Sequence, residues 1–128
     1  MRRIPRRIIK KGKIIMNITI NTNFNAIDRM NVLTSAQDIK KATDTELKVI
    51  GVLIYDSTDK ATGEYKQVGA VKTADGAIFG FTSATLIECA TMLNAAFEDG
   101  ANTITVTPIT GTSKAGRTFY QFKVLNIE

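Results

Sequence analysis

Histidine is absent from the 128 residues, and cysteine occurs once, as Cys89. The chain therefore lacks the commonest general base and the commonest zinc ligand, and neither a Ser-His-Asp nor a Cys-His arrangement can form. A single cysteine also excludes an internal disulfide and a cysteine-rich metal site. Cys89 lies beside the apolar stripe of an expected helix, which favours a packed thiol over a nucleophile. We expect no catalytic residue, metal ligand or cofactor, and no enzymatic activity.

The carboxylates are the next candidates for catalysis. Asp56, Asp59 and Glu64 lie in one turn-rich stretch, and Asp75 precedes a glycine. Aspartates in such turns usually accept hydrogen bonds from nearby backbone N–H groups, and the spacing does not match an EF-hand. The stretch GTSKAG at 111–116 has neither the spacing of a phosphate loop nor a following strand-to-helix transition. These residues are therefore expected to form turns.

Binding is better supported than catalysis, because aromatic residues and cations are interleaved near the C-terminus. In the strand expected at 117–127, alternation divides the side chains between two faces. One face is apolar apart from a phenol and is assigned to the core: Tyr120, Phe122 and Val124. The other combines a ring, an amide and an ammonium, which suits single-stranded nucleic acid: Phe119, Gln121 and Lys123.

Further candidates lie on the turn before this strand and on the strands expected upstream. The residues expected to stack on bases are Tyr55, Tyr65, Phe79 and Phe119. Those expected to contact phosphates are Lys66, Lys72, Lys114, Arg117 and Lys123, with Gln121 beside the Phe119 ring. Each aromatic could instead be a half-buried strand residue, and each lysine could serve solubility or edge protection.

The net charge of +5 is concentrated at the N-terminus. Residues 1–16 hold seven Lys and Arg and no acid, whereas residues 17–128 hold ten basic residues and all twelve acids, a net charge of −2. The arm could seek phosphates or direct the chain to an organelle. A third reading comes from the codons for Lys-Lys-Gly-Lys at 10–13, which form an AAGG-like tract shortly before the Met16 codon, as in a bacterial ribosome-binding site. We expect 1–15 to be a disordered or untranslated basic arm and 16–128 to form one domain.

Hydrophobic patterning predicts a mainly β domain with one helix. Strands are expected at 46–56, 64–73, 77–83, 102–109 and 117–127, with a helix within 83–100 that carries Thr85 and Glu88 at capping-box spacing. A short strand at 16–22 and helical turns around 36–41 are weaker expectations. No apolar run approaches the ~20 residues needed to span a bilayer, so a soluble protein is expected.

The resulting β-β-β-α-β-β order is that of an OB-fold, a five-stranded barrel that binds oligonucleotides or oligosaccharides. An α+β sheet with one helix packed on it has the same order and remains open.

The C-terminal half resembles the single-stranded-DNA-binding proteins of protein-primed Bacillus phages. The resemblance is carried by ADGAIFGFTS at 74–83 and by TITVTPITGTSKAGRTFYQFKVL at 103–125, and is loose over 46–73. It implies an OB-fold-like protein that coats displaced single strands without sequence preference in the host cytoplasm, with single-stranded DNA as ligand and the phage DNA polymerase as a candidate partner. The family tends to have Tyr where this chain has Phe79. A structural or protein-interaction β-domain of a phage or mobile element is the alternative.

Overall fold

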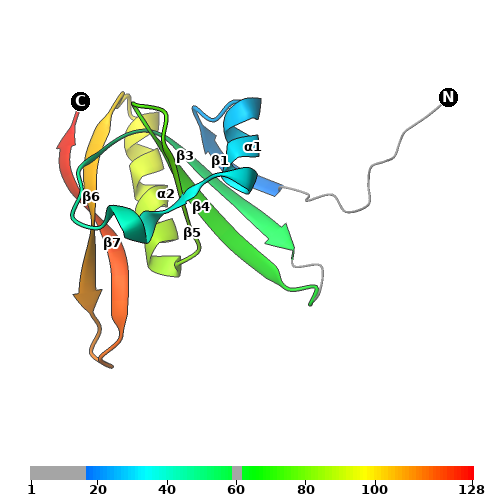
Figure 1. The fold of residues 1–128 in the computed structure, drawn as a ribbon. Coiled ribbons are helices and arrows are strands. Elements are labelled where there is room, and N and C mark those ends of the chain that lie inside the picture. Colours follow the sequence, from blue (N-terminus) through cyan, green and yellow to red (C-terminus); the bar gives the residue numbers. More distant parts are fainter. Residues whose placement is uncertain (1–16, 59–61) are drawn as a thin grey trace.

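The computed structural model describes residues 17–58 and 62–128. Within these ranges the protein is mainly β, with two α-helices, a 3-10 helix and a mixed seven-stranded sheet that curls into a half-barrel (Figure 1). The elements in chain order are β1 Asn17–Thr22, α1 Ala26–Thr34, β2 Gln37–Asp38, η1 Ile39–Ala42, β3 Leu47–Thr58, β4 Tyr65–Thr73, β5 Ile78–Phe81, α2 Ala84–Glu98, β6 Ile104–Thr112 and β7 Thr118–Ile127.

The long strand β3 organises the sheet. One of its edges pairs with β4, and the other is shared by β6, which pairs with residues 47–49, and by β1, which pairs with residues 52–56. β5 extends the sheet beyond β4, and β2 adds to β5 in parallel. Because β6 leaves β3 after a short pairing, the β3–β4 and β6–β7 hairpins diverge and project past the body of the protein (Figure 1).

The two faces of the sheet bury different clusters of side chains. The face under α2 holds the larger cluster, in which the rings of Phe81 and Phe122 meet edge to face with their centroids 5.6 Å apart. The opposite face is covered by the segment that contains α1, with Phe24 packed against Leu53, Tyr55, Ala70 and Ile78. Both faces of β3 are therefore buried, which explains its continuous apolar run, VIGVLIY at 49–55.

The apolar stripe of α2 is buried as its spacing predicts, at Leu86, Ala90 and Leu93. The helix begins differently from the expectation, since Ser83 is the N-cap and its hydroxyl accepts from the backbone N–H of Leu86. Gly100 follows the helix with φ of +109°, a left-handed conformation that glycine adopts without strain and that ends the helix. Cys89 packs partly buried against the core, as expected.

All five strands and the helix expected between residues 46 and 127 are present, as is the short strand β1. The turns expected near 36–41 correspond to η1, whose N-cap is Asp38. The expectation of a single helix is wrong, because α1 also forms behind a capping box between Asn25 and Asp28. Val124 is 47% exposed rather than buried, since β7 has no further strand on its outer side among the described residues.

The expected basic arm, residues 1–15, and the turn residue Asp59 lie outside the described residues. Among the helices that the structure does describe, none combines the length and apolar character needed to cross a membrane.

Candidate nucleic-acid interface

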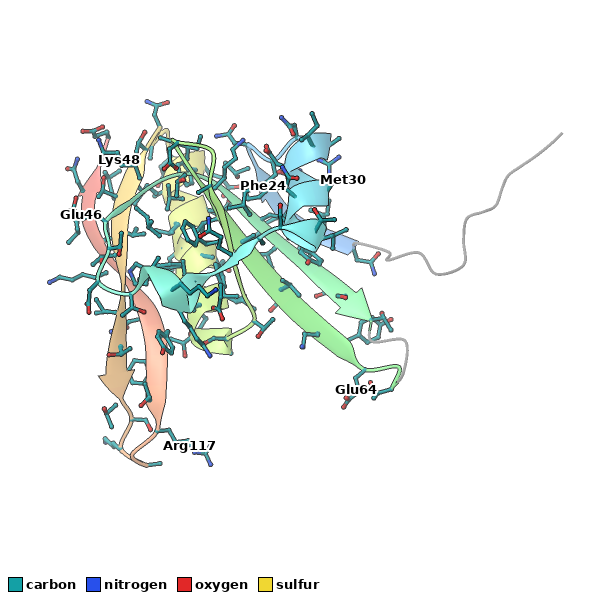
Figure 2. All side chains as sticks on the ribbon, in the orientation of Figure 1. Phe24, Met30, Glu46, Lys48, Glu64 and Arg117 are labelled. Carbon is teal, nitrogen blue, oxygen red and sulfur yellow. The ribbon has the colours of Figure 1, made fainter. Side chains whose placement is uncertain are left out.

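The turn that joins β6 to β7 presents two cations to solvent. The Ser113 N–H donates to the Arg117 carbonyl over 2.8 Å, and the Arg117 N–H donates to Ser113 Oγ over 3.2 Å. Gly116 has φ of +81°, which favours glycine at this position. Lys114 and Arg117 are both exposed, and Figure 2 shows Arg117 at the tip of the hairpin, away from the core. The turn therefore keeps both cations accessible to a polyanion.

Phe119 follows the turn and pairs with Gly111 across the hairpin. A Cβ built on Gly111 would lie 2.5 Å from Cζ and 2.9 Å from Cε1 of Phe119, so the ring covers the glycine backbone. Aromatic rings that cover a strand glycine stabilise the cross-strand pair. The ring remains half-exposed, so it is held against the backbone and still offers surface to a ligand.

Gln121 and Lys123 continue the face on which Phe119 lies, because every second residue of a strand points the same way. Lys123 is exposed and Gln121 is half-buried. On the other face Phe122 is buried and Tyr120 packs partly buried against the core, which confirms the predicted division for these two residues. We call Lys114, Arg117, Phe119, Gln121 and Lys123 the hairpin surface.

The second hairpin brings a separate aromatic to the surface. Tyr65 is 77% exposed at the start of β4, opposite Thr58. Lys66 is also exposed, but as the next residue along the strand it points to the opposite face. Ser57 and Glu64 join these two residues around a shallow pocket of about 350 Å³. This hairpin therefore offers a ring to solvent, with a carboxylate near its cation.

Three residues expected to contact DNA are not available for it. Tyr55 and Phe79 are only 4% and 8% exposed, and burial raises the pKa of the Tyr55 hydroxyl. Lys72 is paired, with its Nζ 2.7 Å from Asp28 Oδ2 on α1. Tyr55 and Lys72 lie on the face of the sheet that the α1 segment covers, and Phe79 lies in the core on the other face. These three residues are therefore not part of the candidate interface.

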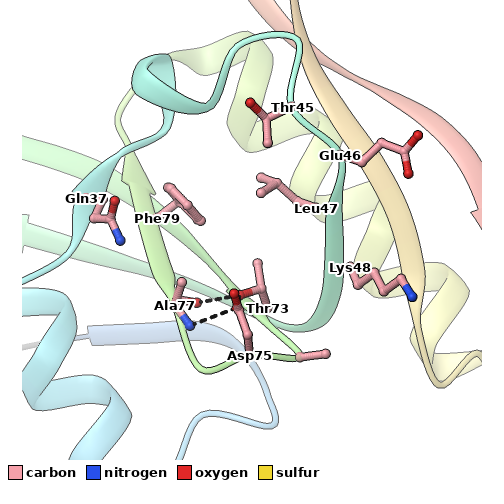
Figure 3. Close-up of a pocket in the computed structure, with 10 residues that line it drawn as sticks. Gln37, Thr45, Glu46, Leu47, Lys48, Thr73, Asp75, Ala77 and Phe79 are labelled. Carbon is pink, nitrogen blue, oxygen red and sulfur yellow. Dashed lines mark hydrogen bonds between the residues drawn. The ribbon is translucent and has the colours of Figure 1, made fainter.

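A pocket of about 550 Å³ opens beside Phe79, between β5, the start of β3 and the turn after β4 (Figure 3). The side chains of Leu47 and Phe79 point toward one another in it, and the Asp75 carboxylate at its lower rim accepts from the Thr73 hydroxyl. Hydrogen bonds from Thr73 and from the Ala77 N–H lower the pKa of Asp75, so the carboxylate stays charged. This negative rim does not favour a phosphate chain.

The sequence patterns did not predict one contact of the β6–β7 hairpin. Lys40 of η1 lies over the ring of Tyr120, with Nζ 5.3 Å from the ring centroid. The arrangement is a cation–π pair, and it adds a cation to the core-facing side of the hairpin. The two residues are far apart in the chain, and no local pattern predicts that they meet.

The β6–β7 hairpin carries an excess of positive charge. Residues 101–127 hold three cations and no acid, whereas residues 17–100 hold seven cations and eleven acids.

Comparisons with protein-family models, curated proteins and solved structures found no match to this chain. The geometry alone combines a fixed, half-exposed ring with three accessible cations on one hairpin. This arrangement can stack a base and neutralise neighbouring phosphates.

Proposed function

We propose that this protein binds single-stranded DNA without sequence preference, and that the hairpin surface makes the main contact. The observation that carries the proposal is the Phe119 ring, held over Gly111 and half-exposed on the strand face that also carries Gln121 and Lys123. A stacked base contributes about 1–3 kcal/mol and requires no particular base, because every base has a π-face. Lys114 and Arg117 at the turn and Lys123 on the strand supply charge for the phosphates.

Tyr65 is the second stacking residue in this proposal. Among the described residues it is the most exposed large hydrophobic side chain, and it belongs to the β3–β4 hairpin, which projects from the body of the protein (Figure 1). Because Tyr65 is 77% exposed, its ring makes few contacts within the protein, and a base would cover it at little cost to the fold. Lys66 contributes to phosphate binding from the opposite face of the same strand.

An OB-fold-like arrangement is the finer description that we favour for the half-barrel. Three observations support it. The strand β3 carries a β-bulge at Ile50 and pairs along both edges, α2 lies between β5 and β6 in the chain, and Phe81 of β5 reaches Phe122 of β7. OB-folds bind oligonucleotides with the loops that follow their first and fourth strands. The corresponding loops here follow β3 and β6, and the second of them carries Lys114 and Arg117.

The biological role rests on the resemblance of residues 74–127 to the phage proteins. In that role the protein coats displaced single strands during phage DNA replication, in the cytoplasm of the bacterial host, where the phage DNA polymerase is its candidate partner. The chain needs no net positive charge for this, because the hairpin provides a local positive patch.

A protein-interaction role is the alternative, favoured by exposed apolar residues at the end of β7: Val124, Leu125 and Ile127. It predicts a defined complex with protein and no response to DNA. Loss of DNA binding on substitution of Phe119, with the fold intact, distinguishes the proposed function from this alternative.

The test is a fluorescence anisotropy titration of labelled oligo-dT, with double-stranded DNA and single-stranded RNA of equal length as comparisons. Both the full chain and a chain that starts at Met16 are titrated, because the seven cations of residues 1–16 could bind polyanions by themselves. We expect the shorter chain to bind oligo-dT at low salt and to lose affinity as salt rises. Absence of binding by the shorter chain at low salt contradicts the proposal.

A further inference from the structure

The helix α1 packs on the sheet through Val32, beside the half-buried Asp28 and Arg29, and leaves its other large apolar side chains on the outer side. Ile27, Met30 and Leu33 are 71%, 62% and 41% exposed, while Asp28 and Arg29 are half-buried. None of the nine residues of α1 is buried. An amphipathic helix on the surface of a domain normally turns its apolar side chains toward the core, whereas in α1 only Val32 of the four large apolar residues does so.

Two sets of interactions fix the rotation of α1 about its axis. Asp28 Oδ2 accepts from the Asn25 N–H over 3.1 Å as part of the capping box, and from Lys72 Nζ over 2.7 Å. Arg29 donates from its guanidinium to the carbonyl of Phe24, and Phe24 is buried on the sheet. At about 100° per residue, the stripe centred on Met30 lies opposite Asp28. Figure 2 shows Met30 on the side of α1 away from the sheet. The stripe is therefore directed to solvent by interactions that hold the helix in place.

The charges next to the stripe do not oppose association of two copies. Asp28 is neutralised by Lys72 within the chain, and α1 contains no charged residue apart from Asp28 and Arg29, whose signs are opposite. The stripe is also self-complementary. In an antiparallel pair of α1 helices, Met30 faces its own copy, and Ile27 faces Leu33 of the other copy at both ends.

We propose that a second copy of this chain covers the stripe, so that the protein forms a two-fold dimer through antiparallel α1 helices. Ile18, 42% exposed on β1, extends the apolar surface, because it pairs with Tyr55 and so lies on the α1 side of the sheet. Four side chains provide less than the ~800 Å² per partner of a standard interface, so the dimer is weak and depends on concentration. The proposal is independent of DNA binding.

The experiment is sedimentation velocity of the full chain without DNA, from about 5 µM to about 500 µM, a range suited to a small interface. Met30→Glu is compared with Met92→Glu, because Met92 of α2 is 71% exposed and provides a matched methionine outside the stripe. Two carboxylates that meet on the axis cost several kcal/mol. We expect the wild type and Met92→Glu to dimerise with rising concentration, and Met30→Glu to raise the dissociation constant by about a hundredfold.

Crosslinking supplies a second readout. Met30→Cys and Met92→Cys are each placed in a Cys89→Ala background and oxidised at equal concentration. A disulfide-linked dimer is expected from the chain with cysteine at 30 and not from the chain with cysteine at 92. The proposal is overturned by a wild type that stays monomeric throughout the range, by a dimer that Met30→Glu leaves unchanged while melting curves show a folded variant, or by equal crosslinking at both positions.

Discussion

The ring of Phe119 covers Gly111, and a Cβ added to that glycine would lie 2.5 Å from Cζ of the ring. Phe81 covers Gly69 in the same way, and a Cβ added there would overlap Cε1 of the Phe81 ring. Phe119 is half-exposed on the projecting hairpin, whereas Phe81 is 6% exposed in the core. The two glycine–phenylalanine pairs therefore allow one local geometry to be compared in a candidate binding surface and in a core.

Gly111→Ala is expected to displace the Phe119 ring and to weaken oligo-dT binding by about fivefold, a part of the ~1–3 kcal/mol of a stacked base. The melting temperature should change little, because the hairpin extends beyond the core. Gly69→Ala is the control, since the displaced Phe81 ring is buried, and overpacking should lower the free energy of unfolding by about 1–3 kcal/mol. Reduced affinity in both variants, in proportion to their loss of stability, would show that the Phe119 ring has no separate role.

Removal of the hairpin cations should reduce the salt dependence of binding. For single-stranded DNA, each neutralised phosphate contributes about 0.7 to the slope of log K against log salt. Lys114→Ala, Arg117→Ala and Lys123→Ala are each expected to make the slope shallower by about this amount. Lys48→Ala, an exposed cation near the pocket of Figure 3, should leave the slope unchanged. Equal slopes for all four variants would place the phosphates elsewhere.

Tyr65 and Tyr55, both on the β3–β4 hairpin, are expected to respond differently to substitution. Tyr65→Ala should weaken oligo-dT binding by about 1–3 kcal/mol and leave the melting temperature unchanged, because this ring is exposed. Tyr55→Phe, which keeps a buried ring, should leave affinity unchanged. Affinity is measured by anisotropy and stability by thermal denaturation. Unchanged affinity in Tyr65→Ala would restrict the binding surface to the β6–β7 hairpin.

The Asp28–Lys72 pair should make stability depend on pH in the acidic range. The hydrogen bond from Lys72 holds the pKa of Asp28 below its ordinary value of 3.8. A depressed folded-state pKa gives stability that is fully present above the unfolded pKa and is lost as the pH falls through the folded pKa. Asp28→Asn is therefore expected to cost about 1 kcal/mol at neutral pH, with the difference from wild type shrinking below pH 3.8. A difference that stays constant in urea denaturations from pH 7 down through this range would show that the charge of Asp28 does not contribute.

The strands and α2 could be predicted because their patterns are local. Alternation in β7 separated Phe119 from Phe122, and helical spacing located Leu86, Ala90 and Leu93. The N-terminal segment was missed because Asn25 and Asp28 form a capping box without serine or threonine, and because only Val32 of the large apolar residues that follow faces the core. An asparagine three residues before an aspartate was the available signal.

The candidate site was only partly accessible to sequence reasoning. Alternation assigns a residue to a face but does not show what covers that face. Tyr55 and Lys72 lie under the segment with Phe24 and α1, and their burial depends on contacts between residues far apart in the chain. Phe119 differs from them because it belongs to neither cluster and stays half-exposed near the turn of the β6–β7 hairpin.

The central claim is that the half-exposed ring of Phe119 stacks on bases. The most direct test compares oligo-dT affinity of wild type, Phe119→Ala and Phe119→Tyr at low salt, in the chain that starts at Met16. Loss of the ring should weaken binding by about fivefold or more, and tyrosine, which keeps the π-face, should remain within about twofold of wild type. Equal affinity of Phe119→Ala and wild type, with both proteins folded, would contradict the account.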